Sequence, residues 1–278
     1  MATIEARPVG FFTDTSICIG CKACEVACKE WNQLEGNPPK FLADSFDNTG
    51  QLDAQNWRHV QFIEKIPDNK GFIPTPTPIA GGQAWLMMSN VCKHCQQASC
   101  MEACPTNAIT RTEFGTVLIQ QDVCNGNRDC IAACPYHVIG FNEKTGTAQK
   151  CTMCYDRLQN GMQPACAKAC PTESIKFGYL EDLQAAADKR LATLQAGGYK
   201  SAQLYGRDTT VYGGLNAFFL LMDTPETYDL PSAGNATLPS RNNVPGYLGG
   251  AVTAIAGLVA GVLAFRSARM SATTTEKR

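Results

Sequence analysis

The chain has 278 residues, of which 44% are apolar and 18% are charged, as in an ordinary globular protein. The formal net charge is −1 and no basic run occurs, so we expect no binding to nucleic acid. Fifteen cysteines, all between Cys18 and Cys170, are the unusual feature and indicate disulfides, zinc sites or iron–sulfur clusters. Because the number of thiols is odd and no N-terminal secretory signal is present, a disulfide framework is disfavoured.

The first cysteine run reads Cys18-x2-Cys21-x2-Cys24-x3-Cys28. This is the spacing of bacterial ferredoxins, in which the fourth thiolate binds the other cluster of a pair. Two-residue gaps let three thiolates hold one small cube, and the x3 step begins a short helix that carries the fourth thiolate away. Zinc sites also use C-x2-C pairs, but they do not need a third cysteine two residues on. The spacing therefore favours an iron–sulfur cluster over a zinc-stabilised scaffold.

Residues 29–91 form an insertion after the first run. They are rich in Asn, Pro and Gly, which predicts loops with short strands. Ala84–Met88 predicts a buried strand that leads into the second run, and Gly115–Gln120 predicts another that leads into the third. The second run reads Cys92-x2-Cys95-x4-Cys100-x3-Cys104-Pro105.

Two further runs repeat the x3-Cys-Pro ending. They read Cys124-x5-Cys130-x3-Cys134-Pro135 and Cys151-x2-Cys154-x11-Cys166-x3-Cys170-Pro171. The proline ends the turn and fixes the direction of the chain. A strand, a cluster loop and a short helix in repeated order predict an α+β fold. We expect two interlocked ferredoxin-like modules over residues 1–180, each with two clusters, together with loop-rich insertions and one C-terminal transmembrane helix.

The exchange of fourth cysteines predicts the ligands of each cluster. The second and third runs are close in sequence and form one expected pair, which leaves the first and fourth runs as the outer pair. The expected ligands are Cys18, Cys21, Cys24 and Cys170 for cluster 1; Cys28, Cys151, Cys154 and Cys166 for cluster 2; Cys92, Cys95, Cys100 and Cys134 for cluster 3; and Cys104, Cys124 and Cys130 for cluster 4.

Cluster 4 lacks one cysteine, because Asn127 stands where the second cysteine of the third run belongs. Three thiolates suit a [3Fe–4S] cluster, since the corner iron without a thiolate is lost. We therefore expect three [4Fe–4S] clusters and one [3Fe–4S] cluster. Two alternatives stay open: an atypical [4Fe–4S] cluster with an oxygen of Asn127 or water on the fourth iron, and a site that does not fill.

The part of the chain after the last cysteine has its own pattern. Residues 181–195 have helical spacing and residues 216–222 form a short apolar run, so residues 181–223 predict a helix–strand extension. Residues 224–245 are polar and rich in Pro and Gly, which predicts a linker.

Residues 246–265 carry no charge. At about 1.5 Å per residue this segment spans the roughly 30 Å of a bilayer core, which predicts a transmembrane helix. A stripe of small residues on one face suggests a helical partner in the membrane: Gly249, Thr253, Gly257 and Gly261. The tail, residues 266–278, is basic, so the positive-inside bias predicts a cytoplasmic C-terminus and a cluster domain on the outer, periplasmic face. We expect that domain to be exported folded, with a partner that carries a signal.

Motifs for catalysis are missing from the sequence. It has no Gly-rich phosphate loop and no nucleophile–base signature, which predicts that the chain has no catalytic centre of its own. His59, His94 and His137 have no second ligand at metal-binding spacing, so we expect them to be hydrogen-bond donors or surface residues.

The chain resembles the beta, iron–sulfur subunit of membrane-bound molybdenum or tungsten formate dehydrogenases, one of a group of four-cluster subunits of molybdopterin oxidoreductases. Besides the cysteine runs, Cys28–Asn32, Asn56–Glu64 and Cys151–Arg157 carry the resemblance. It implies an electron-transfer subunit that relays electrons from a molybdopterin catalytic alpha subunit. The acceptor it implies is a membrane cytochrome b or another quinone-reactive subunit.

Asn127 departs from this family's pattern, in which a cysteine is expected at that position. The similar beta subunits of nitrate reductases have a tryptophan there and carry a [3Fe–4S] cluster. In both families this cluster lies at the membrane end of the chain of clusters. Subunits of nitrate, dimethyl sulfoxide or polysulfide reductase-type complexes therefore stay open as alternatives, as does a soluble polyferredoxin.

Overall fold

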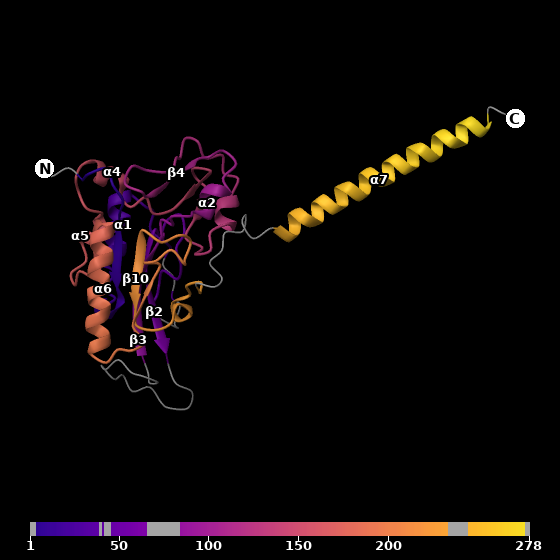
Figure 1. Ribbon diagram of the computed structural model, residues 1–278. Coiled ribbons are helices and arrows are strands. Elements are labelled where there is room, and N and C mark those ends of the chain that lie inside the picture. Colours follow the sequence, from indigo (N-terminus) through magenta and orange to yellow (C-terminus); the bar gives the residue numbers. More distant parts are fainter. Residues whose placement is uncertain (1–3, 39–40, 42–45, 66–83, 233–243, 276–278) are drawn as a thin grey trace. The chain divides into compact units, whose positions relative to one another are not determined.

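The computed structural model describes residues 4–38, 41, 46–65, 84–232 and 244–275 (Figure 1). It divides into two compact units, Met1–Ala236 and Thr237–Arg278, and all the cysteines belong to the first. Parts of three expected segments lie outside the described residues. They are residues 39–40, 42–45 and 66–83 of the insertion, 233–243 of the linker and 276–278 of the basic tail.

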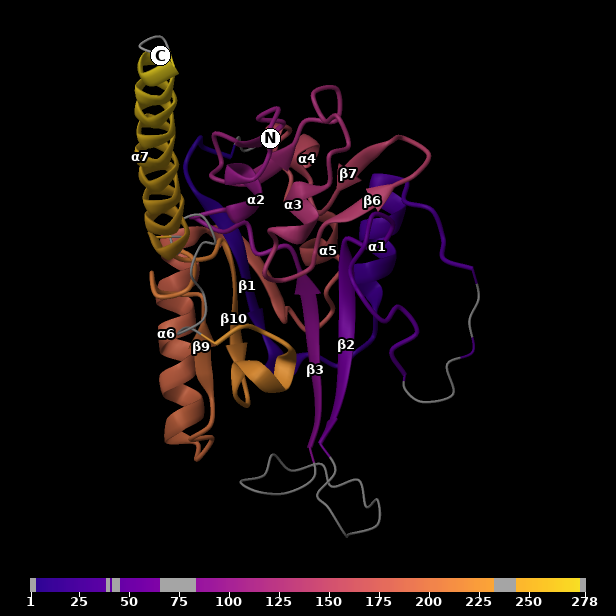
Figure 2. The ribbon, with the colours of Figure 1, turned by 90° about the vertical axis from the view of Figure 1, so that its right-hand side faces the viewer.

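A four-stranded sheet in the order β8-β1-β10-β9 forms the centre of the first unit (Figure 2). Its strands are β1 (Val9–Asp14), β8 (Ile175–Tyr179), β9 (Gln203–Tyr205) and β10 (Ala217–Leu221). β1 pairs in parallel with β10 and antiparallel with β8. Every residue of β1 and β10 is buried, which explains why β10 is apolar throughout and why β1 is apolar up to Phe12, with no alternation.

The expected helix–strand extension is part of this fold. Helix α6 (Leu180–Ala196) packs against β1, β8 and β9, and β10 lies inside the sheet. The expected linker also begins later than its composition predicts. The 3-10 helix η2 (Pro225–Tyr228) belongs to the first unit, and the fully buried Tyr228 accepts a hydrogen bond from the backbone of Met222. The buried aromatic ring holds this segment against the sheet.

Close backbone contact between β1 and the residue before β10 predicts a large effect at Gly10. A Cβ atom there would lie 2.0 Å from the carbonyl oxygen of Asn216, whereas one at the paired Gly178 would meet only Leu183 at 3.7 Å. We expect Gly10→Ala to lower the free energy of unfolding by about 3 kcal/mol and Gly178→Ala to change it by less than about 0.5 kcal/mol. The midpoint at which cluster absorbance is lost on heating reports the stability of each variant. Equal midpoints for the two variants would contradict the prediction.

The x3 steps of all four runs form helices, as expected. These are α1 (Ala23–Asn32), α2 (Ser99–Glu102), α3 (Asp129–Ala132) and α5 (Ala165–Lys168). In each of them the second residue is a cysteine. Only α1 continues past the fourth cysteine, because Lys29 and not proline follows Cys28. α1 packs against α5, and α2 packs against α3.

Three antiparallel hairpins and one more helix complete the first unit. The hairpin strands are β2 (Arg58–Lys65) with β3 (Ala84–Val91), β4 (Ile109–Arg111) with β5 (Val117–Ile119), and β6 (Gly140–Asn142) with β7 (Thr147–Gln149). Helix α4 (Tyr155–Gln159) follows Cys154. The short helices and the two short hairpins gather toward the top of Figure 2. The insertion thus contributes a long hairpin, β2–β3, where short strands are expected.

The second unit is one helix, α7 (Val244–Thr275). Within Val244–Arg269, an 18-residue window has a mean hydropathy of 2.1, and none of that window is buried. By length and composition this helix could span a membrane. It begins two residues before the expected segment and continues beyond it.

Candidate iron–sulfur sites

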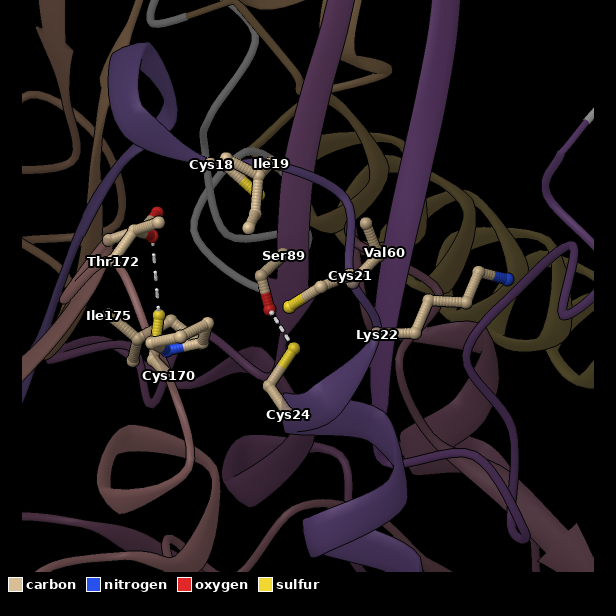
Figure 3. A pocket seen from close by; sticks show the side chains of 12 residues that line it. Cys18, Ile19, Cys21, Lys22, Cys24, Val60, Ser89, Cys170, Thr172 and Ile175 are labelled. Carbon is tan, nitrogen blue, oxygen red and sulfur yellow. Dashed lines mark hydrogen bonds between the residues drawn. The ribbon is translucent and has the colours of Figure 1, made fainter.

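Four cysteines from both ends of the cysteine-rich sequence line one pocket, here called site 1. They are Cys18, Cys21, Cys24 and Cys170. Cys18 follows the 3-10 helix η1 (Thr15–Ile17), Cys24 is on α1, and Cys170 follows α5. Their sulfur atoms face the same space in Figure 3, and the Ser89 hydroxyl lies 3.2 Å from the sulfur of Cys24. The structure therefore brings together the cysteines expected for cluster 1.

The thiols of site 1 favour a positively charged group between them. Burial raises the pKa of Cys18, the backbone amide of Gly20 lowers it, and the negative charges of Cys170 and Cys21 raise it again. Burial likewise raises the pKa of Cys24, to about 12. Several thiolates cannot share this space without a compensating cation, and the irons of a cluster supply one.

Two further groups, site 2 and site 3, are more deeply buried. Site 2 comprises Cys28, Cys151, Cys154 and Cys166, and site 3 comprises Cys92, Cys95, Cys100 and Cys134. Burial raises the pKa of Cys28 well above its usual value, and the charges of the other three members raise it further. Cys95 behaves in the same way within site 3. A backbone amide, that of Met153, donates to the sulfur of Cys151 at 3.3 Å, a type of contact that tunes clusters.

Site 4 has three cysteines. The pKa of Cys130 is raised to about 11, mainly by burial and then by the negative charges of Cys104 and Cys124. Burial also raises the pKa of Cys104, but the hydroxyl and amide of Thr106 and two further backbone amides outweigh it, so that this pKa is lowered overall. The three cysteines expected for cluster 4 thus lie together at a less buried place.

Asn127 takes the place of Cys21 in a repeated loop. Gly20 and Lys22 have left-handed backbones with φ of 64° and 59°, and Gly126 and Arg128 have φ of 75° and 69°. The spacing of Cys18, Cys21 and Cys24 equals that of Cys124, Asn127 and Cys130. The side-chain amide of Asn127 is exposed and donates to the carboxylate of Asp129. The same turn therefore presents an amide where the first run presents a thiol.

The four sites form a line in the sense that an electrostatic interaction links each site to the next. Besides burial, the charge of Cys166 in site 2 raises the pKa of Cys24 in site 1. Besides burial, the charge of Cys92 in site 3 raises the pKa of Cys151 in site 2. In the same way, the charge of Cys130 in site 4 contributes to the raised pKa of Cys100 in site 3. Each of these interactions joins consecutive sites, which gives the order 1-2-3-4.

Buried cations stand among the sites. Burial lowers the pKa of Arg58, but the thiolates of sites 1 and 2 outweigh it and raise the pKa overall. Burial also lowers the pKa of Lys150, but the thiolates of sites 2 and 3 outweigh it, so this pKa is raised overall. For Lys93 beside site 3, burial prevails and lowers the pKa to about 7. Sequence reasoning missed these three residues. Lys93 and Lys150 each adjoin a cysteine in the sequence, which is a usable signal, but Arg58 is far from every run.

Two buried N–H groups test whether these residues fit iron–sulfur clusters. Nδ1 of His94 accepts a hydrogen bond from the amide of Val117 at 3.0 Å, so Nε2 carries the proton. Neither Nε2 of His94 nor Nε of Arg58 has a partner among the described residues. Sulfide and thiolate sulfurs of a bound cluster are acceptors for such groups, so the donor set fits. No three His, Cys, Asp or Glu side chains in the described part of the chain could hold a single metal ion.

The histidines differ in part from expectation. His94 is buried and accepts a hydrogen bond through Nδ1, while its Nε2–H is a donor as expected; His137 is an exposed residue, also as expected. Burial lowers the pKa of His94 well below its usual value, so the ring is neutral. His59 is also buried and bonds to the carboxylate of Asp47 at 2.7 Å.

Comparisons with known proteins agree with this chemistry. A family model described as a 4Fe-4S dicluster domain matches residues 17–108, and another of the same description matches residues 83–180. The formate dehydrogenase iron-sulfur subunit of Haemophilus influenzae is 37% identical over 219 residues, which are 78% of this chain and 66% of the relative. The iron-sulfur subunit of the nitrate-inducible formate dehydrogenase of Escherichia coli is 36% identical over 218 residues, 77% of this chain and 69% of the relative.

The chain belongs to the family of formate dehydrogenase iron–sulfur subunits. As a member of this family it is an electron-transfer protein with 4Fe-4S clusters and has no catalytic centre of its own. A subunit of the anaerobic dimethyl sulfoxide reductase of Escherichia coli belongs to a related branch, with 33% identity over 63% of this chain and 75% of the relative. The match to the formate dehydrogenase subunits spans about two thirds of their length.

Proposed function

We propose that this chain relays single electrons along four clusters, from a molybdopterin catalytic subunit that oxidises formate to a quinone-reactive membrane subunit such as a cytochrome b. The observation that carries the proposal is the succession of four cysteine groups, in which, besides burial, the charge of one group raises a thiol pKa in the next. When bound, iron–sulfur clusters supply reversible one-electron chemistry. The chain fixes their spacing, excludes water around sites 2 and 3, and aims backbone amides and cations at their ligands.

We assign three [4Fe–4S] clusters to sites 1, 2 and 3 and a [3Fe–4S] cluster to site 4. Each site contains cysteines from two runs, and the contacts of α1 with α5 and of α2 with α3 support two modules that exchange their fourth cysteines. Three thiolates and an exposed amide at Asn127 support the three-iron cluster.

Electrons enter at site 1 in this proposal. Cys21 is exposed, and two apolar side chains of the same run, Ile19 and Val26, are each 59% exposed. Solvent-exposed apolar residues next to a redox site suit a docked partner, which would bring its own donor close to site 1. Site 4, at the other end of the line, then faces the membrane subunit.

Formate and dimethyl sulfoxide give opposite results in a test of this function. In the complex purified with its natural partners, formate should bleach the visible absorbance of the clusters, and a quinone analogue should restore it. The related dimethyl sulfoxide reductase subunit makes the reverse reaction a real alternative. Clusters that formate leaves oxidised, but that dimethyl sulfoxide reoxidises after chemical reduction, would assign the chain to that branch.

The apolar helix α7 anchors the chain, with the cluster domain on the outer, periplasmic face and the C-terminus in the cytoplasm. Arg266 and Arg269 follow the apolar segment, and the positive-inside bias supports this orientation.

Deleting the chain after residue 240 should release it from membranes. The cysteines all belong to the other compact unit, so the clusters should remain. Fractionation of cells that lack the membrane partner, with iron and sulfide counted in the soluble fraction, measures both effects. A truncated chain that still sediments with membranes would contradict the anchor.

A further inference from the structure

Arg58 is a charged residue buried inside the protein core between two candidate cluster sites. It is only 2% exposed, on strand β2 of the insertion, and its guanidinium carbon lies 4.8 Å from the centre of the Phe11 ring. Transfer of a charge into such a place costs several kcal/mol unless opposite charge compensates for it. Burial lowers the pKa of Arg58, and the charges that raise it are those of cysteines of sites 1 and 2: Cys166, Cys24, Cys151 and Cys28.

The guanidinium contacts the ligand shells of both sites. Its Nη2 donates to the sulfur of Cys166, in site 2, at 3.2 Å. Its Nη1 donates to the hydroxyl oxygen of Ser89 at 3.2 Å, and that hydroxyl lies 3.2 Å from the sulfur of Cys24 in site 1. A thiolate bound to iron has no proton to donate, so the Ser89 hydroxyl must be the donor to Cys24. The result is one directed chain from the cation to the ligands of two clusters.

This arrangement affects the reduced state more than the oxidised state. Each cluster gains one negative charge on reduction, and nearby positive charge and hydrogen bonds to sulfur favour the more negative state. The effect is strong because the site is buried and poorly screened. The guanidinium remains protonated at every accessible pH, so its charge is constant.

We propose that Arg58 is a redox-tuning residue that raises the reduction potentials of clusters 1 and 2 together, directly at Cys166 and through Ser89 at Cys24. This inference rests on the proposed assignment of these cysteines to clusters 1 and 2. The pair would thereby hold an electron that arrives from the catalytic subunit, before it moves to site 3. A residue of the insertion, outside every cysteine run, thus sets the properties of the entry half of the relay.

Redox titration of the purified complex, followed by EPR, tests the proposal. Arg58→Gln should move two of the four reduction waves to lower potential, each by at least tenfold in the reduction equilibrium, or about 59 mV for one electron. Arg58→Lys keeps the positive charge, but an ammonium group lacks the planar pair of N–H donors that reaches Ser89 and Cys166 at once. Smaller shifts of the same two waves are therefore expected. Ser89→Ala removes only the link to Cys24 and should move one wave.

Arg207→Gln is the matched control, because Arg207 is an exposed residue of the same unit that pairs with Asp188 on α6. It should leave all four waves in place. Full iron content in Arg58→Gln with every potential unchanged would overturn the inference and leave the relay intact. If Arg58→Gln does not assemble, unmoved waves in both Arg58→Lys and Ser89→Ala overturn it. A wild-type chain with fewer than four clusters would instead count against the proposed ligand sets.

Discussion

Asn127→Cys is expected to place a four-iron cluster in site 4, where we propose a three-iron cluster in the wild type. The backbone turn around Asn127 repeats the turn that presents Cys21, so a cysteine there would face the vacant corner of the cube. The oxidised wild type should show the paramagnetic signal of a [3Fe–4S] centre, and the variant should lack it. Iron counted per chain should rise by one, from about fifteen to about sixteen, by the iron content of these cluster types.

Electron transfer to quinone should change more than electron transfer from formate. Cluster type and net charge both set the reduction potential, and site 4 lies at the end of the line away from site 1. Stopped-flow reduction by formate and reoxidation by a quinone analogue separate the two steps. A reoxidation rate that is unchanged while the three-iron signal disappears would place site 4 off the path.

Asn125→Cys is the control, since it adds a thiol to the same loop two residues away. The backbone N–H of Asn127 donates a hydrogen bond to the side-chain oxygen of Asn125. Asn125 does not correspond in position to any cysteine of the first run. We expect this variant to keep the three-iron signal. A wild type with sixteen irons and no such signal would favour the alternative in which Asn127 or water binds a fourth iron.

The local features of the candidate sites could be predicted from the sequence, because cysteine spacing determines how the chain wraps a small cube. The x3 helices and the substitution at Asn127 follow from that spacing, and the grouping of cysteines follows from it together with the exchange of fourth cysteines in two-cluster ferredoxins. The structure places these cysteines together as expected, while their role as ligands stays a proposal. Arg58 could not be found in this way, since it reaches Cys166 across 108 positions of sequence.

Long-range pairing also explains the differences in the fold. The apolar run that forms β10 looks like an isolated strand in the sequence, but it pairs in parallel with β1 from the other end of the unit. Composition predicted a linker from residue 224, because a single buried aromatic residue, Tyr228, is invisible in an average over a polar segment. The β2–β3 hairpin was underestimated for the same reason, since Asn, Pro and Gly dominate the composition of the insertion.

Cys28→Ser is expected to remove the cluster of site 2 and to spare that of site 1, although Cys28 belongs to the first run. Cys28 is buried on α1, and the other three members of site 2 come from the fourth run. Serine offers a harder oxygen ligand, which binds iron–sulfur clusters less well than a thiolate. The reduction wave that disappears should be the one lost in Cys154→Ser.

Cys24→Ser provides the matched control, since Cys24 lies one helical turn before Cys28 on the same helix α1. It should remove the wave that Cys18→Ser removes, and both pairs of variants should lose about four irons per chain, the content of one cubane. The comparison separates ligand exchange from simple damage to α1, because damage would give Cys24→Ser and Cys28→Ser the same spectrum. Loss of the site 1 wave alone in both variants would refute the exchange of fourth cysteines, and with it the interlocked modules, because each run would then hold its own cluster.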